Sequence, residues 1–193
     1  MNSSLPDSQG PVHRRPRTSR SPVRLTVCVL LLLSILATMV MIFRFSSESK
    51  QASGDRSGRV TEMIVSVVVP HYEQRPVEEQ ENIVRRLGRP VRKLAHMTEY
   101  ALLAMLTAAF LLAWDESGHI RTALHWIIPA AFSLLYAASD EFHQIFSNRG
   151  ASVVDVLIDF LGAILGLCFF HGVCAIVRHV RMRRARRTPG AIS

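Results

Sequence analysis

The sequence predicts an all-α, polytopic membrane protein with four transmembrane helices and a helical loop at the outer membrane surface. Its apolar residues are concentrated in four segments, 25–43, 94–114, 122–138 and 153–177. Each segment is close to the roughly 20 residues that an α-helix needs to cross about 30 Å of hydrocarbon. Basic residues gather at the two ends of the chain, and acidic residues gather near the ends of the apolar segments.

The charge distribution predicts which side of the membrane each end occupies. The formal net charge is +8, and five arginines fall in residues 1–24 and six in residues 178–193. Arginines beside apolar spans stay in the cytoplasm, and an even number of spans returns the chain to the same side. We therefore expect both termini to be cytoplasmic and to contact anionic lipids. Nucleic acid is not expected as a partner, because the basicity is confined to the flanks of the spans.

The first two elements are a tail and a membrane anchor. Residues 1–23 are rich in Ser, Pro and Arg, a composition that predicts a disordered basic cytoplasmic tail. Residues 24–45 are expected to form the first transmembrane anchor. A cleaved signal peptide is the alternative, but the apolar run is long for one and no small-x-small cleavage site follows it.

The third element, residues 46–91, is expected outside the cytoplasm as a linker followed by an amphipathic interfacial helix. Residues 46–58 are polar, and the apolar run 60–69 is too short to cross the bilayer. Helical signals begin at Pro76, and Gly88-Arg89-Pro90 predicts a stop. Ile83, Val84 and Leu87 share one face, so this helix should lie on the outer membrane surface.

The remaining chain is expected to form a three-helix membrane core, residues 92–177, and a second basic cytoplasmic tail, residues 178–193. The three cysteines all lie in predicted spans, so no disulfide framework is expected. His125, His171 and the other histidines outside the motifs below have no clustered partners in the sequence. We expect them to be packing or interface residues.

Ionisable residues gather at the outer ends of the last three spans. The second span begins with Arg92, Lys93, His96, Glu99 and Tyr100, of which all except Lys93 share one helix stripe. An imidazole beside a carboxylate can serve as an acid/base pair, as metal ligands or as a polar bond within the bundle. The third span ends with Asp140, Glu141, His143 and Gln144, and the fourth begins with Asp155 and Asp159.

Carboxylates at the top of a span cost several kcal/mol unless they are compensated. Arg92, Lys93 and Arg149 are the nearby cations, so one explanation is a purely structural ion-pair network. The other is a binding or catalytic site, the usual explanation for ionisable groups within a membrane. Gly162 and Gly166 continue the face of Asp159, and this spacing permits close approach of a neighbouring helix.

Two ordered motifs in these residues resemble the VanZ-like family of bacterial membrane proteins. The first is Arg92-Lys93-x-x-His96-x-x-x-Tyr100. The second is Asp140-Glu141-x-x-Gln144-x-Phe146, followed by Arg149, Ser152, Asp155, Asp159, Gly162 and Gly166. The resemblance spans roughly residues 61–167 and implies a small polytopic protein of the bacterial cytoplasmic membrane. The founding member is linked to resistance to the glycopeptide antibiotic teicoplanin, but the family resemblance implies no defined reaction. Ser147-Asn148 departs from the Pro-Gly that relatives often carry before the arginine.

Three functions are compatible with these residues. The first is a binding or accessory protein for an anionic cell-envelope precursor or a glycopeptide, held by Arg92, Lys93 and Arg149. The second is a membrane-embedded acid/base or metal-dependent enzyme acting on lipid-linked substrates. No HExxH, GxSxG or Gly-rich phosphate loop is present. We therefore lean away from an enzyme and expect neither cofactor nor metal, although His96 and His143 are the residues that would bind a metal. The third is a small transporter or a structural membrane protein. The sequence has none of the broken-helix signals that are typical of transporters.

Overall fold

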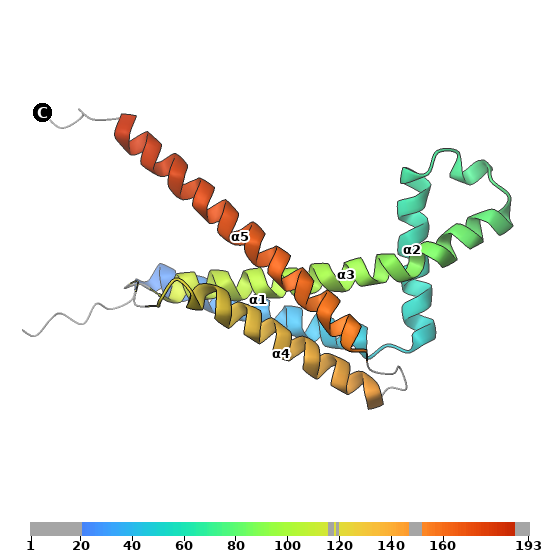
Figure 1. Cartoon of the computed structure of the whole chain (residues 1–193), viewed down its shortest axis with the longest axis horizontal. Helices are drawn as coiled ribbons and strands as arrows, with labels where there is room; N and C mark the ends of the chain where they lie inside the picture. Colours follow the sequence, from blue (N-terminus) through green and yellow to red (C-terminus); the bar gives the residue numbers. More distant parts are fainter. Residues whose placement is uncertain (1–20, 116–117, 119, 147–151, 188–193) are drawn as a thin grey trace, which may run out of the picture.

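The computed structural model describes residues 21–115, 118, 120–146 and 152–187. All regular structure in these ranges is helical, so the predicted all-α class is confirmed. Figure 1 shows the helices, which in chain order are α1 (Pro22–Ser46), α2 (Lys50–Val68), the short 3-10 helix η1 (Tyr72–Gln74), α3 (Val77–Trp114), α4 (Leu124–Phe146) and α5 (Val153–Arg187).

Three of the described helices, α1, α3 and α5, are long and apolar enough to cross a membrane. The fourth predicted span corresponds to α4, which has 23 residues but is not among them. Asp140 and Glu141 in its last turns leave α4 without an 18-residue stretch as apolar as those of the other three helices. The structure therefore supports three spans by length and composition, rather than clearly four.

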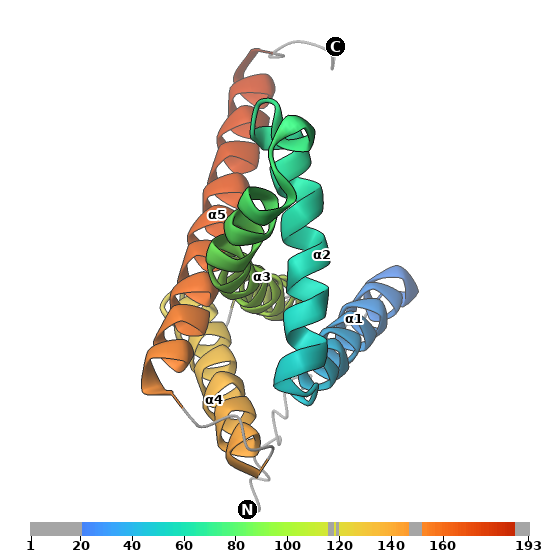
Figure 2. The same ribbon diagram turned by 90° about the vertical axis from the view of Figure 1, so that its right-hand side faces the viewer.

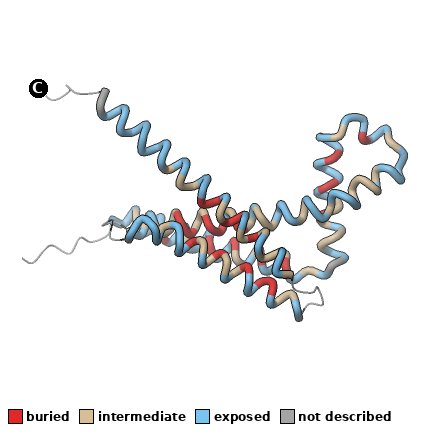
Figure 3. The backbone as a smooth tube through the Cα atoms, viewed as in Figure 1, coloured by how far each residue is buried: buried red, intermediate tan, exposed pale blue. Residues whose placement is uncertain are grey.

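The core lies where α1, α3, α4 and α5 pack together, and Figure 3 shows the buried residues gathered there. Tyr100, Leu103 and Leu167 are completely buried in this region. The outward faces of the same helices are also apolar, with Leu33 and Leu157 more than half exposed. An extensive exposed apolar surface is unusual in soluble monomers and is typical of helices that face lipid.

The prediction of a polar linker over residues 46–58 is wrong, because α2 begins at Lys50. Ser49 caps this helix, and its Oγ accepts a hydrogen bond from the backbone N–H of Ala52 at 3.2 Å. Thr61 and Val65 are buried, on the face that α2 turns toward its neighbours. Figures 1 and 2 show α2 lying across one end of the bundle, beside the first turns of α3.

The predicted helix stop at Gly88-Arg89-Pro90 is also wrong, because α3 continues unbroken to Trp114. A proline inside a helix removes one hydrogen bond and costs about 3 kcal/mol. Contacts with α2 on both sides of Pro90 offset part of this cost. Gly88 lies against Ser57, and the Arg92 guanidinium donates a 3.0 Å hydrogen bond to the Ser57 hydroxyl.

The two ends of the bundle have different compositions. At one end, α1 begins, α3 ends and α4 begins, and Arg24 Nε donates a 2.6 Å hydrogen bond to the Ala113 carbonyl. Figure 1 shows that α5 also runs toward this end. At the other end, α1 and α4 end and α5 begins, and this is where the ionisable residues of the motifs lie.

Candidate functional site

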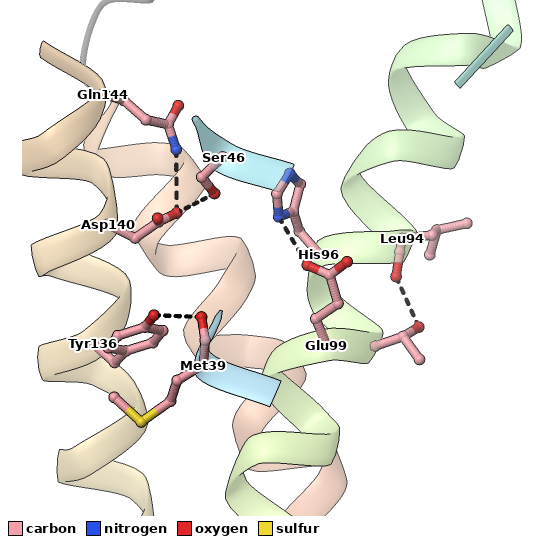
Figure 4. A network of polar contacts seen from close by, with 9 residues as sticks. Met39, Ser46, Leu94, His96, Glu99, Tyr136, Asp140 and Gln144 are labelled. Carbon is pink, nitrogen blue, oxygen red and sulfur yellow. Dashed lines mark hydrogen bonds and ion pairs between the residues drawn. The ribbon is translucent and has the colours of Figure 1, made fainter. Parts of the chain in front are cut away.

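The candidate site is assembled from four helices at the end of the bundle where α5 begins. Figure 4 shows part of it, with Ser46 from α1, His96 and Glu99 from α3, and Asp140 and Gln144 from α4. Because the membrane helices alternate in direction, residues near the end of one helix meet residues near the start of the next. The up-and-down path of the chain thus brings these side chains together.

Asp140 is the most connected carboxylate of this cluster. Its Oδ2 accepts a 2.6 Å hydrogen bond from the Ser46 hydroxyl and a 3.3 Å hydrogen bond from the Gln144 amide. Asp140 is 5% exposed and Ser46 is fully buried, so water does not supply these bonds. The other oxygen, Oδ1, is buried without a hydrogen-bond partner among the described residues. It is therefore an available acceptor.

His96 lies among carboxylates from three helices. Its Nδ1 is 3.4 Å from Glu99 Oε2, close enough for an ion pair if the ring is protonated. Neither atom is aligned for a hydrogen bond with any described residue. Asp140 and Asp159 also lie close enough to interact electrostatically with the ring. The arrangement provides an imidazole and acidic groups that can exchange or share a proton.

Tyr100 lies one turn below His96 and is completely buried. Its hydroxyl has no hydrogen-bond partner among the described residues. Its ring centroid is 6.3 Å from that of Tyr136, whose own hydroxyl donates a 2.6 Å hydrogen bond to the Met39 carbonyl (Figure 4). The Tyr100 hydroxyl thus joins Asp140 Oδ1, His96 Nδ1 and Glu99 Oε2 as a buried polar atom without a hydrogen-bond partner among the described residues. Each such atom lowers the stability of the fold unless a ligand or water satisfies it.

The helix α5 is held directly against the backbone of α3 at two glycines. A Cβ placed on Gly162 would lie 2.3 Å from the Met97 carbonyl oxygen, and one on Gly166 would lie 2.5 Å from that of Ala101. No other residue type fits at these contacts without moving a helix. This close packing brings the first turns of α5, with Asp159, to the part of α3 that carries His96.

The remaining acidic residues join helices at the rim. Lys93 Nζ lies 2.8 Å from Asp155 Oδ1, in a pair that is nearly half exposed. Glu141 is buried, and its Oε1 accepts a 2.5 Å hydrogen bond from the Ser152 backbone N–H just before α5. The first contact links α3 to α5, and the second links α4 to the residue before α5, so both stabilise the packing of these helices. Exposed ion pairs such as the first contribute about 0–1 kcal/mol.

Arg92 turns toward α2 and helps to line a small cavity. The cavity has a volume of about 110 Å³ and lies between the end of α1, α2 and α3. Arg92, His96 and Glu99 line it from α3, and Arg56 and Ser57 line it from α2. We call this space the inner cavity. Arg92 Nε is buried there without a hydrogen-bond partner among the described residues.

Sequence reasoning missed the contributions of Ser46, Arg56 and Ser57. All three lie in residues 46–58, whose polar composition predicts a linker rather than a helix that packs on the bundle. One signal for α2 is present in the sequence: Gly54 and Gly58 have a four-residue spacing that places two small residues on one face of a helix. In addition, Arg56 forms an ion pair with Glu48, which precedes α2.

His96 and His143, the two histidines named above as possible metal ligands, have different neighbours. His96 is paired with Glu99, whereas the His143 ring lies against Phe43, with centroids 4.8 Å apart. Within the described ranges, no group of three or more His, Cys, Asp or Glu residues is arranged to hold a metal ion. Arg149 lies outside the described residues.

A second polar cluster lies at the opposite end of the bundle. His125 Nε2 is 3.4 Å from Asp115 Oδ2, and the His171 ring stacks on Trp126 with centroids 4.2 Å apart. Three helices contribute to it: the end of α3, the start of α4 and the middle of α5. No sequence spacing indicates this cluster, because its members are far apart in the chain.

Comparison with known proteins gives one match. Residues 30–177, more than half of the chain, match the family model described as VanZ/LLP1. Neither the curated proteins nor the solved structures contain a match.

Proposed function

This chain belongs to the VanZ-like family, and from that premise we propose that it binds an anionic group of a cell-envelope precursor at the outer membrane face. The supporting observation is the inner cavity. Arg92 lines it beside His96 and Glu99, and Arg92 Nε lacks a partner among the described residues, whereas Arg56 is paired with Glu48 in the same lining. A buried donor without a partner costs about 1–3 kcal/mol, and an anionic ligand would satisfy it.

The proposal includes an orientation in the bacterial cytoplasmic membrane. We take α4 as a fourth span, since it packs with α3 and α5 and its 23 residues are sufficient to cross. The arginine-rich ends then flank the start of α1 and the end of α5, which lie toward the same end of the bundle (Figure 1). Positive flanks favour the cytoplasm, so the inner cavity faces outward.

The link to low-level teicoplanin resistance is part of the same proposal. A protein that binds an envelope precursor at the outer face would compete for, or shield, the surface that a glycopeptide antibiotic attacks. The family membership supports this role, and guanidinium groups match the phosphate or carboxylate oxygens of such precursors.

The test removes the charge of Arg92 and compares the effect with that of removing the charge of an arginine outside the inner cavity. A deletion strain is complemented with wild type, Arg92→Gln or Arg86→Gln, the last changing an exposed arginine of α3 that does not line the inner cavity. We expect only Arg92→Gln to lose complementation of envelope composition and teicoplanin sensitivity, at unchanged protein abundance. Complementation by Arg92→Gln equal to wild type would count against this site.

A second candidate function, an acid/base enzyme on lipid-linked substrates, is favoured by the environment of His96. The ring lies beside Glu99 and near Asp140, and Asp140 Oδ1 remains unpaired among the described residues. General acid/base catalysis contributes about 10²–10⁴-fold to a rate. His96→Gln should then abolish conversion of lipid-linked precursors by the purified protein while leaving their binding intact. Loss of binding together with conversion, or no conversion by wild type, argues for the binding role instead.

A further inference from the structure

A larger groove lies between α2 and the first turns of α3, on the part of the molecule that projects from the bundle. Figure 2 shows these two segments side by side. The groove has a volume of about 560 Å³ and is open to the surroundings. Arg85, Arg89 and Arg92 enter it from α3, at positions i, i+4 and i+7 of one helix face. We call it the arginine groove.

Glycines keep the arginine groove open. Gly54 and Gly58 of α2 and Gly88 of α3 all line it. A Cβ on any of them would make ordinary contact, at 3.8–4.0 Å, with Arg92, Val84 or Ser57 on the facing helix, so a methyl group would be tolerated but a longer side chain would fill the space. Glycine inside a helix costs about 0.8–1 kcal/mol relative to alanine. Three such positions around one space, none required by close packing, therefore favour an open groove over a stable helix pair.

The guanidinium groups of the arginine groove retain unused hydrogen-bond donors. Arg89 makes no hydrogen bond or ion pair with another described residue. Arg85 donates to the Asn82 side chain, its neighbour on the same helix. Glu62 and Glu81 also line the groove, yet neither forms an ion pair with these arginines in the described part of the chain. Cations and carboxylates thus face one space without neutralising one another directly.

We propose that the arginine groove binds the headgroup of a lipid in which a phosphate is followed by hydroxyl groups. Arginine forks match phosphate oxygens, so Arg85 and Arg89 would hold the phosphate. The carboxylates of Glu62 and Glu81 accept hydrogen bonds, and would hold the hydroxyls of a glycerol or a sugar. A bare phosphate would leave these carboxylates facing an anion, which disfavours it.

The exposed surface of α2 indicates that the ligand is a lipid. Val60, Ile64 and Val67 follow one another at i, i+4 and i+7, and their exposed fractions are 44%, 44% and 83%. A stripe of this kind on a helix that lies across the end of the bundle suits insertion among acyl chains at the membrane surface. The headgroup of a neighbouring lipid then lies at the level of the arginine groove.

This inference goes beyond the proposed function. It depends on that function only for the proposal that this end of the bundle faces the outer side of the membrane. Arg85 and Arg89 do not line the inner cavity, so the two sites can fail separately. The probes are short-chain phosphatidylglycerol, short-chain phosphatidylcholine and sn-glycerol 1-phosphate. Each is titrated by calorimetry into the full-length protein in nanodiscs of phosphatidylcholine.

We expect phosphatidylglycerol to bind more tightly than either of the other probes. The double variant Arg85→Gln/Arg89→Gln should weaken it at least about tenfold, because each lost charge-assisted bond is a substantial part of such an affinity. Arg86→Gln removes one positive charge from the same helix outside the groove and should change the affinity by less than about twofold. Equal thermal unfolding of the three proteins verifies that the variants are folded.

Three outcomes would overturn the proposal. Arg86→Gln weakening the affinity as much as the double variant would indicate general charge attraction. Equal affinity for phosphatidylcholine would indicate recognition of acyl chains alone. Equal affinity for sn-glycerol 1-phosphate would make the ligand a soluble phosphate ester rather than a lipid.

Discussion

Replacing Gly162 by alanine tests whether the contact between α3 and α5 holds the candidate site together. The added Cβ would lie 2.3 Å from the Met97 carbonyl oxygen and 2.7 Å from the Met97 Cα. These neighbours are backbone atoms, which cannot rotate away as a side chain would, so the two helices must separate by roughly 1 Å. Overpacking of this kind costs about 1–3 kcal/mol.

Gly172→Ala is the matched control, because it makes the same chemical change in the same helix. No atom of another element lies within 4 Å of a Cβ placed there. Both variants gain the higher helix propensity of alanine, about 0.8–1 kcal/mol, so this term cancels in the comparison. The difference in unfolding free energy between the two variants is then the overpacking cost alone, about 1–3 kcal/mol.

The measurement is equilibrium unfolding of the full-length protein in mixed micelles titrated with SDS, followed by far-UV circular dichroism. We expect Gly162→Ala to unfold at a lower SDS fraction than wild type, and Gly172→Ala to unfold at the same fraction or a higher one. If the two variants unfold together, the close approach of α5 to Met97 is not a constraint on stability and the reasoning fails.

Two further predictions concern the cluster and the orientation. Ser46→Ala removes the hydroxyl that donates a 2.6 Å hydrogen bond to buried Asp140, and should destabilise the fold by about 1–3 kcal/mol. In the control Ser47→Ala, the exposed hydroxyl donates only to the Phe43 carbonyl of its own helix, and its loss should change stability by less than about 0.5 kcal/mol. SDS unfolding measures both, and equal effects would refute the importance of the Ser46 bond. In a variant without the native cysteines, a cysteine at Ser66 should react with an impermeant maleimide in intact cells, and one at Gly118 only after permeabilisation. The reverse pattern would invert the proposed orientation.

Hydrophobic segment length was enough to predict α1 and the membrane parts of α3 and α5. Lipid removes the competition from water, so an apolar run of sufficient length has few alternatives to a helix. The position of His96, Asp140 and Asp159 near the ends of their segments was enough to place them at one end of the bundle. Their contacts with particular partners depend on helix rotation, which Gly162 and Gly166 help to set.

Local sequence rules failed between residues 46 and 92. The polar composition before Val60 was typical of a linker, but that polarity suits a helix that lies across the end of the bundle. Pro90 predicted a stop, but tertiary contacts with α2 and the apolar sequence after it sustain the helix. The sequence could not identify Ser57 as a site residue, because its role depends on a contact with Arg92, which lies 35 residues later in the chain.

The continuity of α3 means that one helix connects the arginine groove to the opposite end of the bundle. The helix has 38 residues and, at about 1.5 Å per residue, is roughly 57 Å long from Val77 to Trp114. If a headgroup pulls α2 and the first turns of α3 toward the lipid surface, the tilt must pass along this helix or be absorbed by a bend. Pro90, which lacks one backbone hydrogen bond, is the weakest point of the helix. The stiffness of α3 at Pro90 therefore decides how much of a movement at the arginine groove reaches the Asp115–His125 pair at the other end of the bundle.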